Sequence, residues 1–540
     1  MNEPLTVADF FCGAGGFSEG FHQAGFKVIF GLDNWKPAIE THDLNHPFCK
    51  SVCMNILDLD TPEKIDEIIP DTDIIIGSPP CVSFSNSNKS GKADKTLGIQ
   101  LINQYLKIIL HKKTKPGSIL KYWIMENVPN SLNYVKNKYS AEELGLNPNL
   151  SNLIIPEKHE LVASNYGSPQ GRKRAIAGDY ILPEITHNDT NFILTQEIMN
   201  ALGAPLSSSP ETVKDPFYNI QIERSNLSDH LYDNEIPDDW VAKAKRLKTD
   251  HGYMGKMDFP ERTNRLCRTI MATESYCSRE SLIFAKEGTT NKYRAPTIRE
   301  LSSLMGFPIT YQFTGKSSTT KHKQIGNAVC VHLSLALGNA IKNKLNITLS
   351  SLPRELPVLQ NNLNDLPNGL FANHVVKPKK INSKFHIHVP SLKIKQLRVE
   401  LDNLSSDFQK NDFIWKSSLH KGAGKTAMVT SFTNEKITPF LQLDKEWNHT
   451  NDWYKNNIKP RVYNSKHFQE KNCGIENSSN HYSPYETLSL ISEYIQSNIE
   501  ERYLSIPELD NIFHYKKPNT YSIKILYALY LTNKIELELT

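Results

Sequence analysis

The N-terminal segment carries a strand, a glycine-rich turn, a helix and a second strand in close succession, and this order constrains the fold most strongly. Residues 6–11 are an apolar run that predicts the first strand, and residues 12–16, Cys-Gly-Ala-Gly-Gly, follow as a turn. Residues 17–24 have a helical pattern, and residues 27–31 predict a second strand that ends just before Asp33. The pattern indicates an α/β fold built on an open sheet.

The glycines of this turn favour a ligand site at the start of the helix. Glycine lets backbone amides approach a ligand at a helix N-terminus, and the acid after the second strand, Asp33, can accept hydrogen bonds from ribose hydroxyls. The turn lacks the lysine and Ser/Thr of a P-loop and the full GxGxxG spacing, so we expect a nucleoside ligand that needs no phosphate cradle. A tight turn without a ligand is the alternative.

A cysteine follows another apolar strand at a stiff turn. Residues 73–77 predict a buried strand, and Ser78-Pro79-Pro80-Cys81 comes directly after it. The two prolines restrict the backbone, so the thiol of Cys81 is held rigidly, as a nucleophile requires. The apolar run at residues 122–125 leads in the same way to Glu126. Because carboxyl ends of parallel strands meet at one crevice, Cys81 and Glu126 are expected to face the same ligand. A buried core cysteine and a solvated acid are the alternatives.

Composition limits the class of protein. The chain has 540 residues and a net charge of only +4, so a surface for nucleic acid has to be local. Eight cysteines without a CxxC pair favour reduced thiols, and neither a signal peptide nor a membrane-spanning run is present, so we expect a soluble, cytoplasmic protein. His42, His46, Cys49 and Cys53 could bind zinc, but their spacing is not a standard zinc pattern, and we predict no metal.

Taken in order, the motifs resemble those of the C5-cytosine DNA methyltransferases. The matching segments are residues 9–16, 77–81, 126–128, 170–174, 294–308 and 324–329. Several short matches in one order are more specific than any single match, and the resemblance covers about residues 5–345. It implies an S-adenosylmethionine-dependent, Rossmann-like methyltransferase domain with an inserted small target-recognition domain.

The resemblance implies S-adenosylmethionine as cofactor. It implies that Phe11 stacks on the adenine, that Asp33 holds the ribose, and that Asn327 completes the cofactor side of the sheet. Asn55 stands where the family usually has an acid near the adenine amino group, and its amide oxygen can still accept a hydrogen bond. The implied cofactor-binding residues are Phe11, Gly13, Gly15, Gly16, Asp33, Asn55, Pro80 and Asn327.

The implied chemistry explains why these catalytic residues are needed. Carbon 5 of cytosine is a poor nucleophile, and addition of the Cys81 thiolate at carbon 6 makes it able to attack a sulfonium methyl group. Glu126 is expected to stabilise N3, while Arg174 and Arg172 are candidates for O2. Cys81 stands where amino-methylating enzymes of this scaffold carry an aromatic residue. The target base must be flipped from the duplex, and residues 82–98 predict a loop that closes over it.

Residues 181–292 are the interval in which we expect DNA sequence to be read. The regular alternation of predicted strands and helices is lost in this interval, and a locally basic stretch suits contacts with DNA phosphates. The candidate DNA-binding residues are Ser85, Arg268, Thr269 and Arg279. A strand and turn that only support the fold are the alternative for the last three.

We expect the catalytic domain to comprise residues 1–180 and 293–345, followed by a linker at 346–380 and an additional C-terminal α+β domain at 381–540 of unknown role. Near residues 483–540, three helices at 483–496, 505–513 and 521–531 and an alternating β tail at 534–539 suggest a winged-helix-like module. Residues 421–426 resemble a P-loop but lack its first glycine, because Leu419 occupies that position.

The leading hypothesis is a DNA (cytosine-5-)-methyltransferase that acts on a specific sequence in double-stranded DNA. We expect it to belong to a restriction-modification system with a separately acting restriction endonuclease, to work as a monomer on DNA, and to be associated with the nucleoid. An RNA (tRNA) cytosine-5 methyltransferase is the first alternative, and the sizeable recognition interval argues against it. A DNA-binding protein with a fused nuclease module is the second, and the intact catalytic motifs argue against it.

Overall fold

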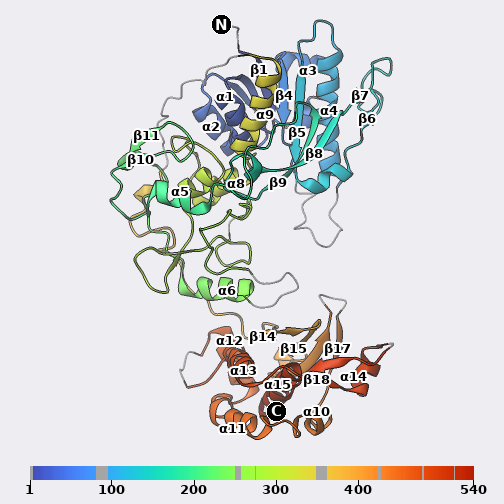
Figure 1. The fold of residues 1–540 in the computed structure, drawn as a ribbon, viewed down its shortest axis with the longest axis vertical. Helices are drawn as coiled ribbons and strands as arrows, with labels where there is room; N and C mark the ends of the chain where they lie inside the picture. The colour runs from blue at the N-terminus through green and yellow to red at the C-terminus, as the bar shows by residue number, and fades with distance from the viewer. Residues whose placement is uncertain are drawn as a thin grey trace. The chain divides into compact units, whose positions relative to one another are not determined.

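The computed structural model describes residues 4–80, 95–249, 257–273, 275–347, 362–422, 427–476, 480–515 and 517–539 (Figure 1). The chain divides into two compact units. The first comprises Met1–Val241 and Pro260–Ala372, and the second comprises Ala242–Phe259 and Asn373–Thr540. Within the described residues, no helix is both long enough and apolar enough to cross a membrane.

A seven-stranded sheet is the framework of the first unit, with strand order β3-β2-β1-β4-β5-β9-β8. Its strands are β1 Thr6–Phe10, β2 Lys27–Asp33, β3 Lys50–Cys53, β4 Ile74–Gly77, β5 Tyr122–Asn127, β8 Glu157–Val162 and β9 Lys173–Asp179. The first five strands in this order run parallel, and β9 runs antiparallel to both of its neighbours. The predicted α/β fold with a Rossmann-like sheet is confirmed.

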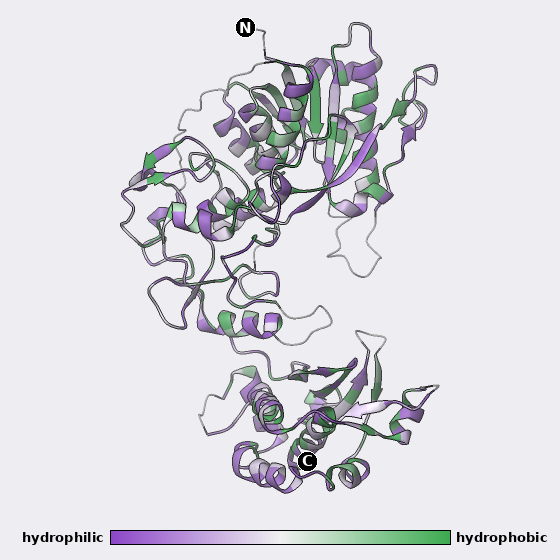
Figure 2. Cartoon of the chain, viewed as in Figure 1, coloured by the Kyte–Doolittle hydropathy of each residue, from purple (hydrophilic) through white to green (hydrophobic). Residues whose placement is uncertain are grey.

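Helices cover both faces of this sheet, which explains why its central strands are apolar runs rather than alternating ones. The covering helices are α1 Gly16–Gln23, α2 Lys36–Asn45, α3 Pro62–Ile68, α4 Thr96–Thr114 and α9 Val331–Lys344. Ile74 and Ile76 of β4 belong to one buried cluster with Phe17 of α1, whereas Ile75 belongs to another with Tyr105 of α4. In Figure 2 the centre of the sheet is correspondingly hydrophobic.

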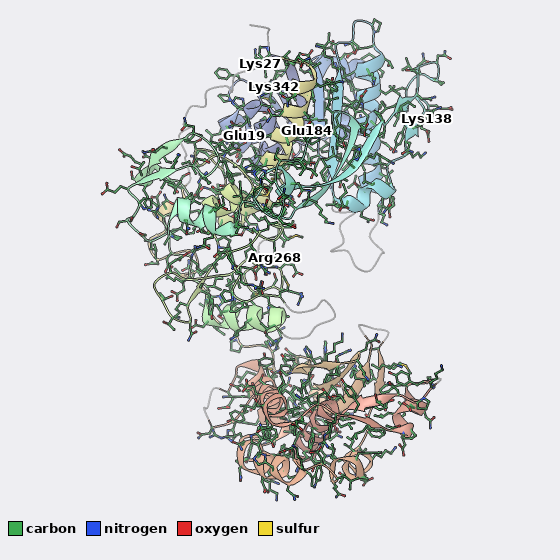
Figure 3. All side chains as sticks on the ribbon, viewed as in Figure 1. Glu19, Lys27, Lys138, Glu184, Arg268 and Lys342 are labelled. Carbon is green, nitrogen blue, oxygen red and sulfur yellow. The ribbon has the colours of Figure 1, made fainter. Side chains whose placement is uncertain are left out.

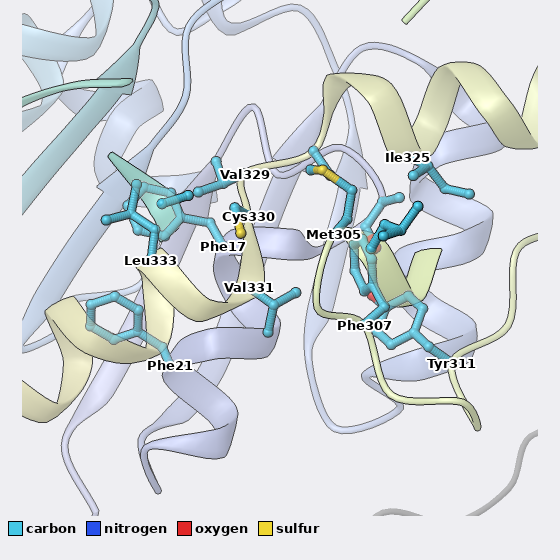
Figure 4. Close-up of a cluster of buried hydrophobic side chains, with 14 of the residues drawn as sticks. Phe17, Phe21, Met305, Phe307, Tyr311, Ile325, Val329, Cys330, Val331 and Leu333 are labelled. Carbon is cyan, nitrogen blue, oxygen red and sulfur yellow. The ribbon is translucent and has the colours of Figure 1, made fainter. Parts of the chain in front are cut away.

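Residues from late in the sequence complete the first of these clusters. Helices α7 Ile298–Leu304 and α8 Ser318–Asn327 precede α9. Figure 4 shows Phe307 and Tyr311 from the segment between α7 and α8 in the same cluster as Phe17. The hydroxyl of Tyr311 donates to the carbonyl oxygen of Ala14 over 2.5 Å. The chain therefore returns to its own N-terminal turn.

The segment between β9 and α7 is built from short elements. They are α5 Thr195–Leu202, β10 Thr212–Lys214, β11 Gln221–Glu223, α6 Asp238–Thr249, β12 Phe284–Ala285 and β13 Tyr293–Arg294, and most of α6 belongs to the second unit. The short strands β6 Lys138–Tyr139 and β7 Leu153–Ile154 come earlier in the first unit. A buried ion pair links the segment to α8, because Asp229 pairs with Lys321 at 2.7 Å and both side chains are fully buried. Such a segment gives little periodic signal in a sequence.

A four-stranded antiparallel sheet is the framework of the second unit, in the order β14-β15-β16-β17. The strands are β14 His386–Ile394, β15 Leu397–Asp402, β16 Lys416–Lys421 and β17 Met428–Thr430, with a separate pair, β18 Tyr503–Ser505 and β19 Thr520–Ser522. The helices are α10 Asn434–Leu441, α11 Trp447–Asn457, α12 Ser465–Cys473, α13 Pro484–Asn498, α14 Pro507–Ile512 and α15 Ile523–Leu539. Short 3-10 helices occur in both units at Ile56–Asp58, Pro129–Asn133, Ala163–Tyr166, Arg224–Asn226, Leu363–Asp365, Phe408–Lys410 and Lys459–Arg461.

The three helices predicted near the C-terminus are confirmed as α13, α14 and α15, but the predicted β tail is wrong. Helix α15 continues through residues 534–539 to Leu539. Ile535 and Leu539, four residues apart, are buried, whereas Leu537 is 68% exposed. A strand would place all three side chains on one face, so the burial follows the helical period.

Candidate active site

The glycine-rich turn between β1 and α1 adopts a left-handed backbone at three positions. Phe11 has a φ of 54°, Gly13 of 54° and Gly15 of 93°. The carboxylate of Asp33 at the end of β2 accepts hydrogen bonds from the amides of Gly13 at 3.0 Å and Trp35 at 2.8 Å. Burial raises the pKa of Asp33, and these amide hydrogen bonds oppose that rise. The structure therefore brings Asp33 to the turn.

Space beside the turn is open on one side and filled on the other. A Cβ atom added at Gly13 would meet nothing closer than the Phe11 carbonyl oxygen at 4.0 Å. At Gly15 it would lie 2.5 Å from the Tyr311 hydroxyl, and at Gly16 2.3 Å from the Val329 carbonyl oxygen. The protein thus packs against Gly15 and Gly16, while the backbone at Gly13 borders free space. This arrangement fits a nucleoside cofactor bound against the Gly13 side.

The remaining residues predicted to bind a cofactor lie near strand ends or helix ends. Phe11 is half-buried directly after β1, and Asn55 is exposed, with its side-chain oxygen accepting from the Leu57 amide at 3.1 Å. Pro80 is exposed three residues after β4, and Asn327 is exposed at the last position of α8.

A buried polar network beneath the turn escaped the sequence reasoning. Ser18 donates to Asp9 at 2.7 Å and lies 3.0 Å from Nε2 of His42, whose Nδ1 lies 2.9 Å from the Ser51 hydroxyl. Burial raises the pKa of Asp9 to about 8 and lowers that of His42 to about 4. Asp9 belongs to the first motif, but nothing in the sequence pairs it with Ser18. The network fixes the first turn of α1 beneath the glycine loop.

The Ser-Pro-Pro turn is anchored at the carboxyl end of the sheet. The amide of Ser78 donates to the Phe10 carbonyl oxygen at 3.0 Å, and the side-chain amide of Asn127 donates to the Pro79 carbonyl oxygen at 3.0 Å. Cys81, Ser85 and most of the predicted loop at 82–98 lie outside the described residues. The described backbone nevertheless fixes the starting point of the segment that carries Cys81.

Glu126 is held from two sides at this edge. Ser78 Oγ donates to Glu126 Oε2 at 2.9 Å, and Arg174 Nε lies 2.8 Å from Oε1. The side chains of Glu126 and Arg174 are only 6% and 12% exposed. Arg174 comes from β9, which pairs with β5 so that Ala175 faces Asn127. A buried carboxylate with both oxygens engaged has a fixed orientation, as proton transfer or charge stabilisation at a base would require.

Arg172 has different contacts from Arg174. Its guanidinium is buried and donates to the backbone carbonyl oxygens of Ile270 at 3.0 Å, Gly326 at 3.1 Å and Ala328 at 3.2 Å. Gln170 adds a second link, because its side chain donates to the Leu304 carbonyl oxygen at 2.7 Å and accepts from the Ile270 amide at 3.2 Å. The sequence predicted Arg172 beside the base, and this stays a prediction; the structure shows that its guanidinium contacts these main-chain atoms.

These side chains dock residues 267–272, which we call the recognition strap. The Cys267 amide donates to the Pro169 carbonyl oxygen at 2.7 Å. A Cβ atom added at Gly326 would lie 2.4 Å from the Met271 carbonyl oxygen, so the strap passes directly over the end of α8. Thr269 is half-buried within the strap.

The two arginines predicted to contact DNA lie in or near the strap. Arg268, labelled in Figure 3, pairs with Glu261 through Nε at 2.9 Å and Nη2 at 2.5 Å, and Nη2 also donates to the Ser281 carbonyl oxygen at 2.9 Å. Arg279 is half-buried in the segment that follows the strap. The ion pair fixes the Arg268 guanidinium within its own segment.

Comparisons with known proteins identify the family of this chain. The family model "C-5 cytosine-specific DNA methylase" matches residues 5–343. The chain is 30% identical over 354 residues to type II methyltransferase M.HgiDI of Herpetosiphon aurantiacus, which covers 63% of this chain and 96% of that protein. It is 26% identical over 380 residues to type II methyltransferase M.XorII of Xanthomonas oryzae, covering 64% and 86% respectively. Among solved structures, Entamoeba histolytica methyltransferase EhMeth is 18% identical with a TM-score of 0.44, covering 64% of this chain and 99% of that one.

The match decides between the hypotheses drawn from the sequence. It confirms the resemblance over most of the predicted range and favours DNA methylation over both the RNA-methylating and the fused-nuclease alternatives. S-adenosylmethionine is the methyl donor of this family, and the open side of the glycine turn fits it. The chain belongs to the C-5 cytosine-specific DNA methylases and is a DNA (cytosine-5-)-methyltransferase.

Proposed function

We propose that Cys81 is the nucleophile that activates a cytosine flipped out of duplex DNA, with Glu126 and Arg174 binding the base. The observation that carries this proposal is the position of Glu126 between Ser78 and Arg174. Ser78 opens the turn that leads to Cys81, so the acid, the arginine and the start of the nucleophile segment share one edge of the sheet.

The electron flow assigns a role to each side chain. The Cys81 thiolate adds to carbon 6, and the electron pair of the 5,6 double bond becomes available at carbon 5. When bound, S-adenosylmethionine would supply the methyl group that bonds to carbon 5, and its sulfonium–methyl bond would break to leave S-adenosylhomocysteine. The carbon 5 proton then leaves to a base, the sulfur–carbon 6 bond breaks, and the thiolate is regenerated. Glu126 stabilises N3 while charge enters the ring, and Arg174 stabilises O2.

Arg172 serves this site in a different way. Its partners are backbone carbonyl oxygens in the recognition strap and after α8. We assign it a positioning role, in which it holds the strap against the strand that carries Arg174.

The cofactor roles extend those implied by the family. Phe11 stacks on adenine, Asp33 binds the ribose, and Asn55 accepts from the adenine amino group in place of an acid. Pro80 and Asn327 border the same site, and Gly13 lets the backbone approach the cofactor. Gly15 and Gly16 shape the turn on its other side, where Tyr311 and Val329 pack against them. The free space beside Gly13 supports this assignment.

DNA contacts are assigned to the segment between β9 and α7 and to the segment after Cys81. Residues 181–292 act as the target-recognition domain, in which Thr269 and Arg279 reach the DNA together with Ser85 of the segment after Cys81. Arg268 approaches the DNA only if its pair with Glu261 opens. The C-terminal domain at 381–540 lies beyond the linker at 346–380 and outside the family match.

The names of two relatives support a place for this enzyme in a restriction-modification system. Because M.HgiDI and M.XorII are named type II methyltransferases, we propose that this enzyme modifies one specific sequence and protects it from a separately acting restriction endonuclease. It works as a monomer on nucleoid DNA in the cytoplasm.

Bisulfite sequencing of DNA from cells that express the protein tests the reaction and its sequence specificity together. We expect one cytosine of one short motif to resist bisulfite conversion completely, and we expect this resistance to be lost in Cys81→Ala. Purified enzyme should transfer labelled methyl groups from S-adenosylmethionine to duplex DNA but not to tRNA. Unchanged transfer by Cys81→Ala would refute the covalent mechanism.

A further inference from the structure

Helices α12 and α13 belong to the second unit (Figure 1). Three side chains that could hold a metal ion meet there, one from α12 and two from the segment between the helices. His467 lies in the first turn of α12, Glu476 follows the end of that helix, and His481 precedes α13. Their ligand atoms all lie within 4.8 Å of one another, and each residue is partly buried. We call these three residues the His–Glu–His cluster.

The backbone on either side of each member is fixed by its own hydrogen bonds. The His467 amide donates to the side chain of Asn464, the residue that caps α12, at 2.8 Å. Gly474 closes the helix in a left-handed conformation, and the Ile475 amide donates to the Glu470 carbonyl oxygen at 3.0 Å. These bonds set the course of the chain into Glu476.

The third member is fixed from the other side. The Tyr482 amide donates to the Arg461 carbonyl oxygen at 3.0 Å, and Arg461 Nη1 donates to the Asn480 carbonyl oxygen at 3.3 Å. The chain is therefore held both immediately before and immediately after His481. A cluster held in this way needs little further ordering to bind an ion.

One separation within the cluster is close to that of two atoms bound to the same ion. Ligands bound tetrahedrally to zinc at about 2.0–2.2 Å lie about 3.3–3.6 Å from one another. Nε2 of His467 lies 3.2 Å from Oε2 of Glu476, and the imidazole rings of His467 and His481 lie 4.5 Å apart at 78°. Nε2 of His467 is buried and, although it lies within ion-pair distance of Glu476, makes no hydrogen bond among the described residues. A lone pair directed at a cation would satisfy it.

We propose that the second unit binds one divalent transition-metal ion of the zinc class through His467, Glu476 and His481. Two imidazoles and one carboxylate suit zinc, cobalt or nickel, whereas magnesium and calcium prefer oxygen ligands alone. Three protein ligands leave a fourth position for water, which is the pattern of an open rather than a closed structural zinc site. The ion joins α12 to the segment before α13.

The competing explanation of the cluster is an ion pair between His467 and Glu476 without a metal ion. The metal content of the protein distinguishes the two explanations. The full-length protein is stripped with chelator, dialysed, and titrated with Zn²⁺ and then, separately, with Co²⁺. We expect one tightly bound equivalent per chain, measured by elemental analysis. Because loss of outer-shell partners alone lowers metal affinity about 10–100-fold, His467→Ala and His481→Ala should weaken binding at least tenfold.

His449→Ala is the matched control, because this histidine lies in the same unit and its side chain is 63% exposed. It should retain the wild-type affinity. The proposal would be overturned if the wild-type protein bound no metal ion tightly. It would also be overturned if His467→Ala and His481→Ala bound the metal as tightly as wild type.

The Co²⁺ spectrum of the wild-type protein provides a test that does not depend on folded variants. Nitrogen and oxygen ligands give visible bands without thiolate charge transfer. Thiolate bands would assign the ion to cysteines such as Cys49 and Cys53 and would also overturn the proposal. Neither readout depends on methyl transfer, so the proposal stands apart from the roles given to Cys81 and Glu126.

Discussion

Arg172 donates from Nη1 to the carbonyl oxygen of Ile270 over 3.0 Å, although 98 residues separate them in the sequence. Nη2 reaches Gly326 and Ala328, so one guanidinium joins the residue before β9 to two other segments through main-chain atoms. The link is independent of the side chains that those segments carry.

Arg172→Ala should therefore unfold more easily than wild type. Removing a buried charged donor from three carbonyl oxygens is expected to lower the free energy of unfolding by about 2–4 kcal/mol. Urea unfolding followed by fluorescence measures this. Lys27→Ala is the control, because Lys27 is an exposed cation of the same unit and its removal is expected to change stability by less. Equal unfolding midpoints for Arg172→Ala and wild type would contradict the positioning role.

Glu126→Gln should lower the rate of methyl transfer about 10²–10⁴-fold, because the amide keeps the shape of the side chain but loses its acid function. Single-turnover transfer of labelled methyl groups gives this rate directly. Cofactor affinity, measured by calorimetry, should change little.

The double variant Glu126→Gln/Arg174→Ala tests whether the two residues act together. Because they form one pair at 2.8 Å, their losses should not add. Fully additive losses would show that each residue meets the base independently.

Gly326→Ala should impair methyl transfer by displacing the recognition strap. Its Cβ atom would lie 2.4 Å from the Met271 carbonyl oxygen and 2.5 Å from Cα of Ala272, so main chain has to move. The matched control is Gly171→Ala, since a Cβ atom there meets nothing within 4 Å. We expect DNA affinity and kcat to fall in the first variant and to remain near wild type in the second. Equal activity of the two variants would argue against close docking of the strap.

His332→Phe should make the protein less sensitive to acid. Burial, and secondarily His187, lowers the pKa of His332 from 6.5 to about 3, and its ring packs on Phe217 at 4.2 Å. The unfolded chain therefore binds a proton that the native state excludes, so stability falls as the pH drops from about 6.5 toward about 3.

Phenylalanine removes this contribution while retaining the ring. The thermal unfolding midpoint is measured near neutral pH and in mild acid for both proteins. The drop in midpoint between the two conditions should be smaller in the variant than in wild type. The same acid-induced drop in both proteins would show that His332 does not titrate on unfolding.

The sheet could be predicted because its strands are buried on both faces. Ile74, Ile75 and Ile76 therefore form a continuous apolar run that is recognisable in the sequence. The pair of Glu126 and Arg174 was also within reach, since Glu126 comes directly after the apolar run at residues 122–125 and Arg174 belongs to a motif. The tail at residues 534–539 was misread because strict alternation over six residues imitates a strand. Only the packing of α15 shows which of its leucines are buried.

The contacts of Gln170 and Arg172 could not have been predicted from local pattern. Both residues bond to backbone atoms about 100 residues or more away, and a carbonyl oxygen carries no residue identity that a sequence could reveal. Ser18 and Asp9 are similar, because only the fold brings a helix serine over a strand acid. Segments without periodicity, such as the recognition strap, are recognisable in sequence mainly by where they occur.

The close passage of the strap over Gly326 has a consequence for building chimeric enzymes. A recognition segment grafted from another methyltransferase would have to bring its own main chain past a residue without a side chain and present a carbonyl oxygen to Arg172. Residues 267–272 therefore have to keep their main-chain course, and the parts of the segment that can be exchanged lie on either side of them. Libraries that vary specificity should leave that short stretch of backbone intact and diversify the surrounding loops.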